Sequence, residues 1–253
     1  MILADFTLQD SLANIAVDEA MLDVAEASAM EAQGESAFDA TDSASSEVLR
    51  LWEPNSPVVV LGRSSPFETE VNHAYCARHG VPIVRRCSGG QSVVTGPGCL
   101  MYAVLLDYRL RPELRMLDVA HAFVMNKMRD ALLGVGITTE ISGTSDLTLD
   151  GRKVSGNSLR CKRHWLIYHG TMICDLDIDL IANCLGQPAR QPEYRSQRSH
   201  REFLVQLDTT VDQLKAAIAK TWNAEPGGYQ WPQDQTRRLL ESKYRTAEWT
   251  QKV

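Results

Sequence analysis

A turn rich in small residues follows a short apolar run in the first half of the chain. Residues 81–84 predict a buried strand, and residues 85–100, with the sequence RRCSGGQSVVTGPGCL, provide glycines where the main chain can come close to a ligand. About fifty residues later, residues 150–156 place Lys153 between Gly151 and Gly156. Because main-chain N–H groups and a fixed ammonium both attract anions, we interpret the pair as a site for a phosphate and a carboxylate.

Apolar runs and helical periodicity alternate along the rest of the chain. The expected strands lie at 48–52, 58–62, 81–86, 100–108, 137–141, 165–173 and in a hairpin over 146–154. The expected helices lie at 11–29, 116–133, 177–185 and 209–223. This order predicts an α/β (α+β) protein in which helices flank a mixed β-sheet core.

The chain is long enough for one large core. Its 253 residues are 44% hydrophobic, and no repeat or Gly/Pro-rich linker divides them. We therefore expect a single domain over 1–253. Residues 30–47 are small, polar and acidic, which predicts a flexible insertion between a helix and a strand.

Composition and charge exclude several classes of protein. Apolar runs are far shorter than the roughly 20 residues that cross a bilayer, and the first residues, MILADFTLQD, lack signal-peptide features, so we expect no membrane association and a cytoplasmic location. The net charge of −6 disfavours nucleic-acid binding, and residues 190–201, with four arginines and a histidine, are interpreted as a solvated basic surface. The six cysteines show no CxxC spacing, which indicates reduced thiols rather than a zinc site or disulfides.

An ordered set of motifs resembles the lipoate-protein ligase A family, within the biotin/lipoate ligase and octanoyltransferase superfamily. The motifs are ANIAVDEAML at 13–22, LRLWEP at 49–54 with VVVLGR at 58–63, EVN at 70–72, RRCSGG at 85–90, SDL at 145–147, GRKVSGNSLR at 151–160 and HGT at 169–171. Each motif alone is weak evidence, whereas their order is specific. The resemblance covers most of the chain and implies a biotin/lipoate ligase-like catalytic domain.

The resemblance also implies a two-step reaction. ATP and a medium-chain acid, lipoate or octanoate, would form an acyl-adenylate, and the acyl group would pass to a lysine of a lipoyl carrier domain of the 2-oxoacid dehydrogenase E2 or glycine-cleavage H type. The chemistry of ATP implies Mg²⁺, for which we identify no ligand cluster in the sequence. A reaction that joins two anions needs a fixed cation and main-chain donors.

Particular residues match the positions that carry this chemistry in the family. Lys153 matches the lysine that would bridge the carboxylate and the α-phosphate, although by type alone it would be an exposed hairpin lysine. Arg86 suits bidentate contact with phosphate. The remaining matches would bind or support the nucleotide and acyl-adenylate: Ser88, Gly89, Gly90, Gln91, Ser92, Val93, Val94, Asp146, Ser155 and Gly156, with Arg63 and His169 behind them.

Three departures from the family pattern leave a second reading open. Gln91 replaces a glycine, Thr95 a histidine and Cys99 an asparagine, and the altered loop resembles that of octanoyltransferases, which move an acyl thioester without ATP and use a cysteine thiolate. Cys184 lies near the expected position but lacks the preceding proline, so a buried helical cysteine is the plainer interpretation. Cys87 matches no family nucleophile.

A third reading is a binding protein that has lost catalysis. The retained Lys153 and Arg86 argue against it, because a binder needs no cation at the phosphate position.

The match ends near Trp249, where the family's large domain ends, so we expect no C-terminal accessory domain. Transfer would then require a separate accessory subunit or an acceptor that completes the site.

Overall fold

A mixed eight-stranded sheet lies at the centre of the computed structural model, which describes residues 1–31, 47–186 and 190–252. Strand β1 runs parallel to both of its neighbours, and the strands from β2 onward pair antiparallel. In spatial order the strands are β11 (Glu225–Pro226), β1 (Ile2–Asp5), β2 (Val48–Trp52), β6 (Cys99–Asp107), β10 (Trp165–Ile173), β9 (Arg152–Cys161), β8 (Asp146–Leu149) and β7 (Glu140–Ser142).

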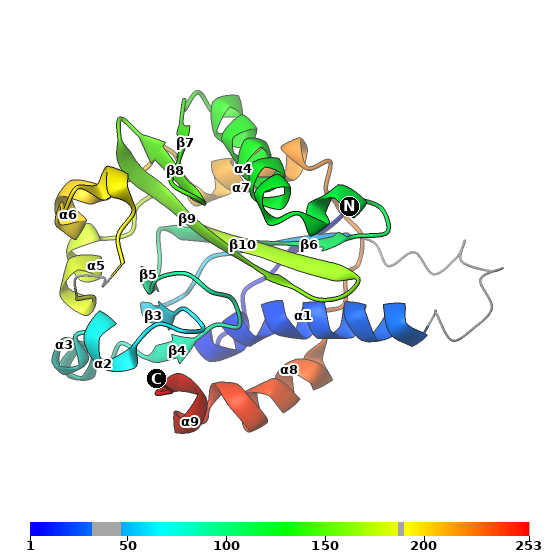
Figure 1. The fold of residues 1–253 in the computed structure, drawn as a ribbon, viewed down its shortest axis with the longest axis horizontal. Coiled ribbons are helices and arrows are strands. Elements are labelled where there is room, and N and C mark those ends of the chain that lie inside the picture. Colours follow the sequence, from blue (N-terminus) through cyan, green and yellow to red (C-terminus); the bar gives the residue numbers. More distant parts are fainter. Residues whose placement is uncertain (32–46, 187–189, 253) are drawn as a thin grey trace.

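A smaller sheet and the helices cover the two faces of this centre (Figure 1). The smaller sheet consists of β4 (Ile83–Arg85), β3 (Val58–Leu61) and β5 (Val93–Thr95). Helices α4 (Leu117–Gly134) and α7 (Val211–Thr221) lie on one face of the large sheet, and α1 (Ser11–Glu31) lies on the other, with α8 (Gln233–Leu239) outside it. The shorter elements are α2 (Phe67–Glu70), α3 (His73–His79), η1 (Pro112–Arg115), α5 (Ile178–Cys184), η2 (Glu193–Arg195), α6 (His200–Phe203), the π-helical η3 (Leu240–Tyr244) and α9 (Ala247–Thr250).

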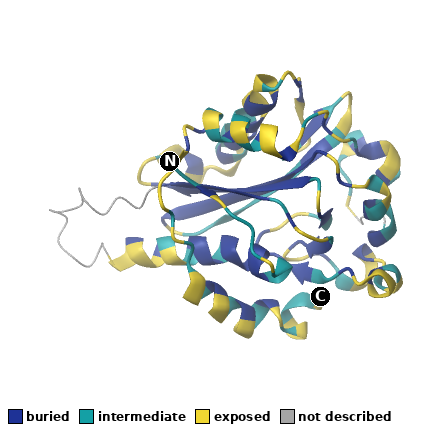
Figure 2. Cartoon of the chain, turned by 180° about the vertical axis from the view of Figure 1, so that it is seen from behind, coloured by how far each residue is buried: buried dark blue, intermediate teal, exposed yellow. Residues whose placement is uncertain are grey.

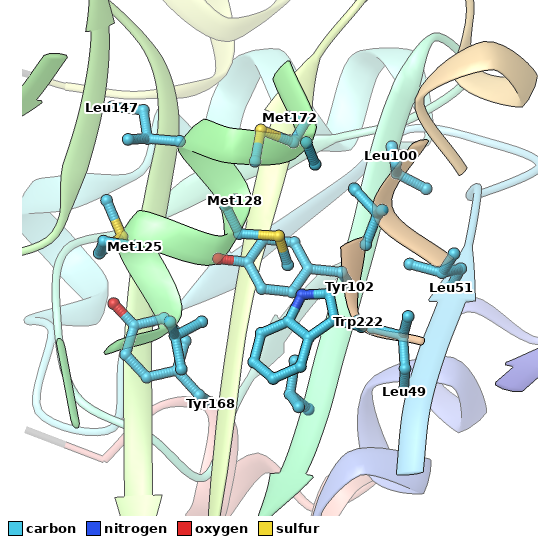
Figure 3. Close-up of a cluster of buried hydrophobic side chains, with 14 of the residues drawn as sticks. Leu49, Leu51, Leu100, Tyr102, Met125, Met128, Leu147, Tyr168, Met172 and Trp222 are labelled. Carbon is cyan, nitrogen blue, oxygen red and sulfur yellow. The ribbon is translucent and has the colours of Figure 1, made fainter. Parts of the chain in front are cut away.

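The long central strands are buried on both faces, which explains their continuous apolar sequences. Along β6, Leu100, Tyr102 and Val104 face α4 and α7, whereas Ala103 and Leu105 face α1. Figure 3 shows part of the first cluster, where Tyr102 lies between methionines of α4 and β10 and Trp222. Figure 2 shows the same division of the molecule, with buried strands between helices whose outer faces are exposed.

The C-terminal segment is held against β4 by Arg85, whose side chain is completely buried. Its guanidinium donates to the carbonyl oxygens of Trp249, Thr250 and Lys252 over 2.8–3.1 Å, and to those of Gly62 and Ser65 over 2.7 Å. Because these five carbonyls come from two segments, one guanidinium fixes both the turn after β3 and the end of the chain. Arg85 therefore points away from the cavity described below.

The predicted class and most predicted elements are confirmed. The helix expected at 11–29 is α1, which extends to Glu31, and the strands and helices expected elsewhere correspond to β2, β3, β4, β6, β7, β8 to β10, α4, α5 and α7 with small shifts at their ends. The prediction missed β1, β5, β11 and the short helices. The insertion predicted at 30–47 lies almost wholly outside the described residues, and its first two residues are helical. Within the part of the chain that the structure describes, no helix is both long and apolar enough to span a membrane.

Candidate active site

A cavity of about 310 Å³ opens between the large sheet, the small sheet and the segment 190–204. This volume is typical of sites for small molecules. One part of its wall is apolar, with side chains from α1, β3, β5, β6, β10, α5 and α6: Ile15, Val60, Val93, Val94, Met101, Ile173, Ile181, Leu185, Phe203 and Leu204. The charged side chains of the wall are Asp18, Glu70, Arg86, Asp146, Lys153, Arg190 and Arg195. The cavity can therefore hold a ligand with an apolar chain and an anionic head.

Lys153 lies near the start of β9, next to a hairpin turn whose two residues both have positive φ. Its ammonium forms an ion pair of 2.8 Å with Asp146 on the neighbouring strand, and its side chain is 22% exposed in the cavity wall. The register of β8 and β9 shifts between Leu147 and Thr148, and such a bulge changes the direction of the side chains beside it. The ammonium is therefore held in place and remains accessible to a ligand.

Gly156 makes the position of this ammonium possible. A Cβ atom at residue 156 would lie 2.7 Å from Nζ of Lys153 and 3.8 Å from Oδ1 of Asp146. The other carboxylate oxygen of Asp146 accepts a hydrogen bond of 2.7 Å from the Tyr194 hydroxyl. A side chain at 156 would displace the lysine, so the glycine and the aspartate together set where its charge lies.

Arg86 organises the glycine-rich loop between β4 and β5. Its guanidinium donates to the carbonyl oxygens of Gly89 (2.5 Å), Gln91 (3.0 Å) and Val60 (3.2 Å), and its Nε donates to Ser88. Burial lowers the pKa of Arg86 to about 10. The sequence predicted bidentate contact with phosphate. In this structure the guanidinium lies in the cavity wall and binds the loop, and its contact with phosphate stays a prediction.

Glu70 and Gln91 complete the loop from its other side. The Glu70 carboxylate accepts hydrogen bonds from the main chain and hydroxyl of Ser92, at 3.0 and 2.5 Å. The carboxamide oxygen of Gln91 is buried and has no hydrogen-bond partner among the described residues. Because Gln91 lines the cavity, this oxygen is an acceptor that a ligand with an N–H or O–H group would satisfy.

A chain of polar side chains connects helix α1 and strands β9 and β10 with Ser88 of the loop. Asp18 of α1 pairs with Nη1 of the buried Arg50 and with Nδ1 of His169, both at 2.8 Å. Nε2 of His169 lies 2.5 Å from the hydroxyl of Ser88, which lies 2.7 Å from the hydroxyl of Ser158. Asp18, His169 and Ser158 line the cavity, and Ser88 is buried between the last two.

Part of the segment 190–204 lines the cavity, which corrects its interpretation as a solvated basic surface at Arg195 and His200, whereas Arg201 is exposed as expected. Arg190, Arg195 and His200 are in the wall, and Arg195 is only 4% exposed, with its guanidinium 4.8 Å from the ring centre of Phe203. Its Nε donates to the carbonyl oxygen of Arg198. Of the four arginines in this segment, Arg190 and Arg195 therefore add positive charge to the cavity wall.

The pKa of His200 reports this positive surrounding. Burial, followed by the charges of Arg195 and Lys153, lowers the pKa from 6.5 to about 4. In the unfolded chain His200 therefore binds a proton near pH 6.5, whereas in the folded chain it does so only near pH 4. Its contribution to the free energy of unfolding is fully present above this range and is lost as the pH falls through it.

We expect His200 to account for on the order of 1 kcal/mol of unfolding free energy lost between pH 7 and pH 5. Urea unfolding at both pH values checks this, and His200→Gln should lose less stability on acidification than the native chain. The exposed His79 provides the matched control, because His79→Gln should leave the pH dependence unchanged. Equal pH dependence in the native chain and His200→Gln would contradict the prediction.

The structure brings together most of the residues that the sequence singled out. Those in the cavity wall are Arg86, Gly90, Gln91, Ser92, Val93, Val94, Asp146, Lys153, Gly156 and His169. Outside the wall lie Ser88 and Ser155, which are buried, and Gly89 and Arg63, which are exposed. Ser155 bonds the side chain of Asn157, and the Arg63 main chain donates to Ser88. The structure therefore gives these four residues supporting positions.

The loop departures lie partly in the core rather than in the site. Thr95 is completely buried and donates to Sδ of Met101 over 3.0 Å, and the Cys99 side chain is completely buried nearby. Neither residue is in the cavity wall. These two replacements therefore change packing behind the loop, whereas Gln91 changes the wall itself.

None of the six cysteines, all of which lie in the described ranges, is in the wall of this cavity. Cys184 ends α5 with no exposed surface, and burial raises its pKa to about 12. Burial also raises the pKa of Cys87 and Cys99 to about 12. A thiol in such surroundings is a poor source of thiolate at neutral pH.

Several cavity residues were missed as site residues by sequence reasoning. Asp18, Glu70, Asn157 and Ser158 fall inside the quoted motifs but were given no role. Position along the strand could have indicated Ser158, because it follows Gly156 by two residues on β9 and so points to the same face. The residues of 190–204 carry no local signal, because only tertiary contacts place them on the site.

Comparison with known proteins identifies related sequences. Residues 23–223 match the family described as the lipoyl protein ligase A/B catalytic domain. Lipoate-protein ligase 1 of Staphylococcus aureus is 24% identical over 215 residues, which is 79% of this chain and 62% of that protein. Lipoate-protein ligase LplJ of Bacillus subtilis is 27% identical over 164 residues, or 64% of this chain and 47% of that protein. The chain thus spans less than two thirds of the length of these relatives.

Solved structures share the fold over nearly the whole chain. Protein Ta0514 of Thermoplasma acidophilum, described with bound lipoic acid, superposes with a TM-score of 0.76 at 17% identity, covering 100% of this chain and 98% of that one. The bi-partite ligase of the same organism, described with its E2 lipoyl domain, gives 0.75 at 18% identity, covering 99% and 95%. A lipoate-protein ligase A bound with ATP gives 0.69 at 18% identity and covers 99% of both chains.

Proposed function

Because the chain belongs to the lipoyl protein ligase A/B catalytic domain family, we propose that it activates lipoate or octanoate with ATP and transfers the acyl group to a lysine of a lipoyl carrier domain. The observation that carries the proposal is the Lys153 ammonium, fixed by Asp146 over Gly156 in the wall of a cavity that is otherwise largely apolar. The bound lipoic acid and ATP of the similar structures support the choice of substrates.

In the first step, an oxygen of the acid's carboxylate attacks the α-phosphorus of ATP, and pyrophosphate leaves. Lys153 would bind the carboxylate and a non-bridging α-phosphate oxygen at once, which brings the two anions together and stabilises the charge that develops between them. Arg190 and Arg195 add positive charge to the same wall. The apolar wall would hold the acyl chain and keep water from the mixed anhydride.

Mg²⁺ is proposed as the companion of ATP rather than as a resident metal. Three carboxylates line the cavity, and each already has partners: Asp18 binds Arg50 and His169, Glu70 binds Ser92, and Asp146 binds Lys153 and Tyr194. Among the residues that the structure describes, no cluster of three metal-ligating side chains exists. The ion would therefore be bound mainly by the phosphates, where it would offset their charge.

In the second step, a lysine of the carrier domain attacks the acyl carbon and AMP leaves. The acceptor class is supported by the E2 lipoyl domain described with the bi-partite archaeal ligase. Of the two ways in which we propose that transfer is completed, a separate accessory subunit or an acceptor that completes the site, the bi-partite organisation of that ligase supports the first. The alternative, transfer of an acyl thioester without ATP, would require a thiolate in the site, and none of the six cysteines lines this cavity.

A direct assay tests the proposal. The purified protein is incubated with ATP, Mg²⁺ and either acid, and mass spectrometry is used to look for the acyl-adenylate before and after a lipoyl domain is added. We expect the adenylate first and an acylated lysine second. Acylation of the domain from an acyl-carrier thioester, with no adenylate formed from the free acid, would instead show the transferase reaction.

A further inference from the structure

The side chains of Asp18, His169, Ser88 and Ser158 form a continuous hydrogen-bonded chain that ends at the cavity. The three links measure 2.8 Å between Oδ2 of Asp18 and Nδ1 of His169, 2.5 Å between Nε2 of His169 and Ser88, and 2.7 Å between Ser88 and Ser158. We propose that this chain is a proton relay in which His169 accepts, through two hydroxyls, the proton that the attacking amine loses during acyl transfer. The inference rests on the proposed function.

With Asp18 ionised and the imidazole neutral, the partners assign a direction to every hydrogen in the relay. An ionised Asp18 accepts only, so Nδ1 of His169 donates and Nε2 of the neutral ring is the acceptor. The Ser88 hydroxyl therefore donates to Nε2. Its oxygen accepts from Nε of Arg86 at 3.1 Å and from the Ser158 hydroxyl. Both hydroxyl hydrogens thus point toward the imidazole, and the Ser158 oxygen can accept a proton from the cavity.

The geometry makes the hydroxyls the path to the basic nitrogen. His169 contributes to the cavity wall, but both of its ring nitrogens are bonded, one to Asp18 and one to Ser88. Ser88 is only 1% exposed and is absent from the wall, whereas Ser158 lines it. A ligand therefore meets the relay at Ser158. The arrangement gives Ser88 no access to an acyl group, which excludes it as a nucleophile.

Only the second half-reaction has a proton for this relay. Adenylate formation joins a carboxylate oxygen to phosphorus and releases pyrophosphate, and no N–H bond breaks. In transfer, the free amine attacks the acyl carbon, a C–N bond forms, and the C–O bond to the phosphate breaks with its electron pair on AMP. The proton lost by nitrogen passes to Ser158, the Ser158 proton passes to Ser88, and the Ser88 proton passes to His169. The imidazolium returns it to water by the reverse path.

One charged group contacts the imidazole directly, and others contact its hydrogen-bond partners or line the same cavity. Asp18 from α1 faces Nδ1 and stabilises the imidazolium. Arg50 from β2 pairs with the other oxygen of Asp18, and Arg86 follows β4 and donates to Ser88. Lys153 from β9 and Glu70 from α2 line the same cavity.

Separate measurement of the two half-reactions tests the relay. Acyl-adenylate formation is followed in single turnover with MgATP and octanoate, and transfer is followed from preformed adenylate to a lipoyl domain. We expect Ser158→Ala and His169→Gln each to slow transfer about 10²-fold. The slowing of transfer should be at least about tenfold larger than any slowing of adenylate formation.

Two further variants separate a relay from a structural role. Ser158→Thr keeps a hydroxyl and should recover most of the transfer rate lost in Ser158→Ala. His164→Gln removes another buried histidine, whose Nδ1 lies 2.9 Å from Oε1 of Glu26 and which does not line the cavity. This variant should leave the ratio of the two rates unchanged. Equal slowing of both half-reactions, or unchanged transfer in Ser158→Ala, would overturn the relay. Absence of adenylate from the native protein would instead refute the proposed function.

Discussion

Replacement of Lys153 by alanine should slow formation of the acyl-adenylate by roughly two to three orders of magnitude. The ammonium is the cation that the hairpin holds in the cavity wall, 2.8 Å from Asp146, and the substitution leaves that carboxylate facing two incoming anions. Repulsion then adds to the lost attraction. The measurement is the single-turnover rate of acyl-adenylate formation with MgATP and lipoate or octanoate, followed by mass spectrometry.

Lys162 provides the matched control for this substitution. It also forms an ion pair with an aspartate, at 2.5 Å from Asp23, and its side chain is 30% exposed, close to the 22% of Lys153. It does not line the cavity. Lys162→Ala should therefore form adenylate at the native rate. A Lys153→Ala protein that retains the native rate would remove Lys153 from the chemistry and leave the cavity without its assigned cation.

The elements that the sequence predicted well are those whose local pattern matches their final surroundings. Strands β6 and β10 are buried on both faces, so their apolar runs are unbroken, and α4 and α7 carry a helical period against one cluster. Strand β5 has only three residues and lies inside the loop whose glycines dominate the local signal. Helices α8 and α9 are largely polar and are fixed by contacts with distant parts of the chain, among them those of Arg85.

The same distinction applies to the candidate site. Motif resemblance located Lys153, Gly156 and the loop residues, because each lies within a short contiguous pattern. It could not show that Arg86 would bind loop carbonyls, since that depends on how the loop closes. It could not place Arg195 over the cavity either, because a buried arginine and a solvated one look alike in sequence. The parts of the site that only tertiary packing creates were the ones missed.

Replacement of Arg50 by methionine should lower the free energy of unfolding by about 3–5 kcal/mol. The guanidinium is completely buried, where it donates to Asp18, to the main chain of Asn14 and to its side chain over 2.8–2.9 Å, and it lies 4.8–4.9 Å from the rings of Phe6 and Trp52. Methionine can fill part of the volume, but it leaves the buried carboxylate of Asp18 without its main counter-charge. Urea unfolding of the native and variant proteins measures the loss.

Two comparisons assign that loss to the buried charge rather than to the change of side chain. Arg237→Met removes an exposed ion pair of 3.2 Å with Asp234 and should change stability by less than about 0.5 kcal/mol. The double variant Arg50→Met/Asp18→Asn should be more stable than Arg50→Met alone, because it removes the uncompensated charge as well. If Arg50→Met were within about 1 kcal/mol of the native protein in stability, water or a rearranged cation would have to reach Asp18. Arg50 would then not be what fixes the carboxylate behind His169.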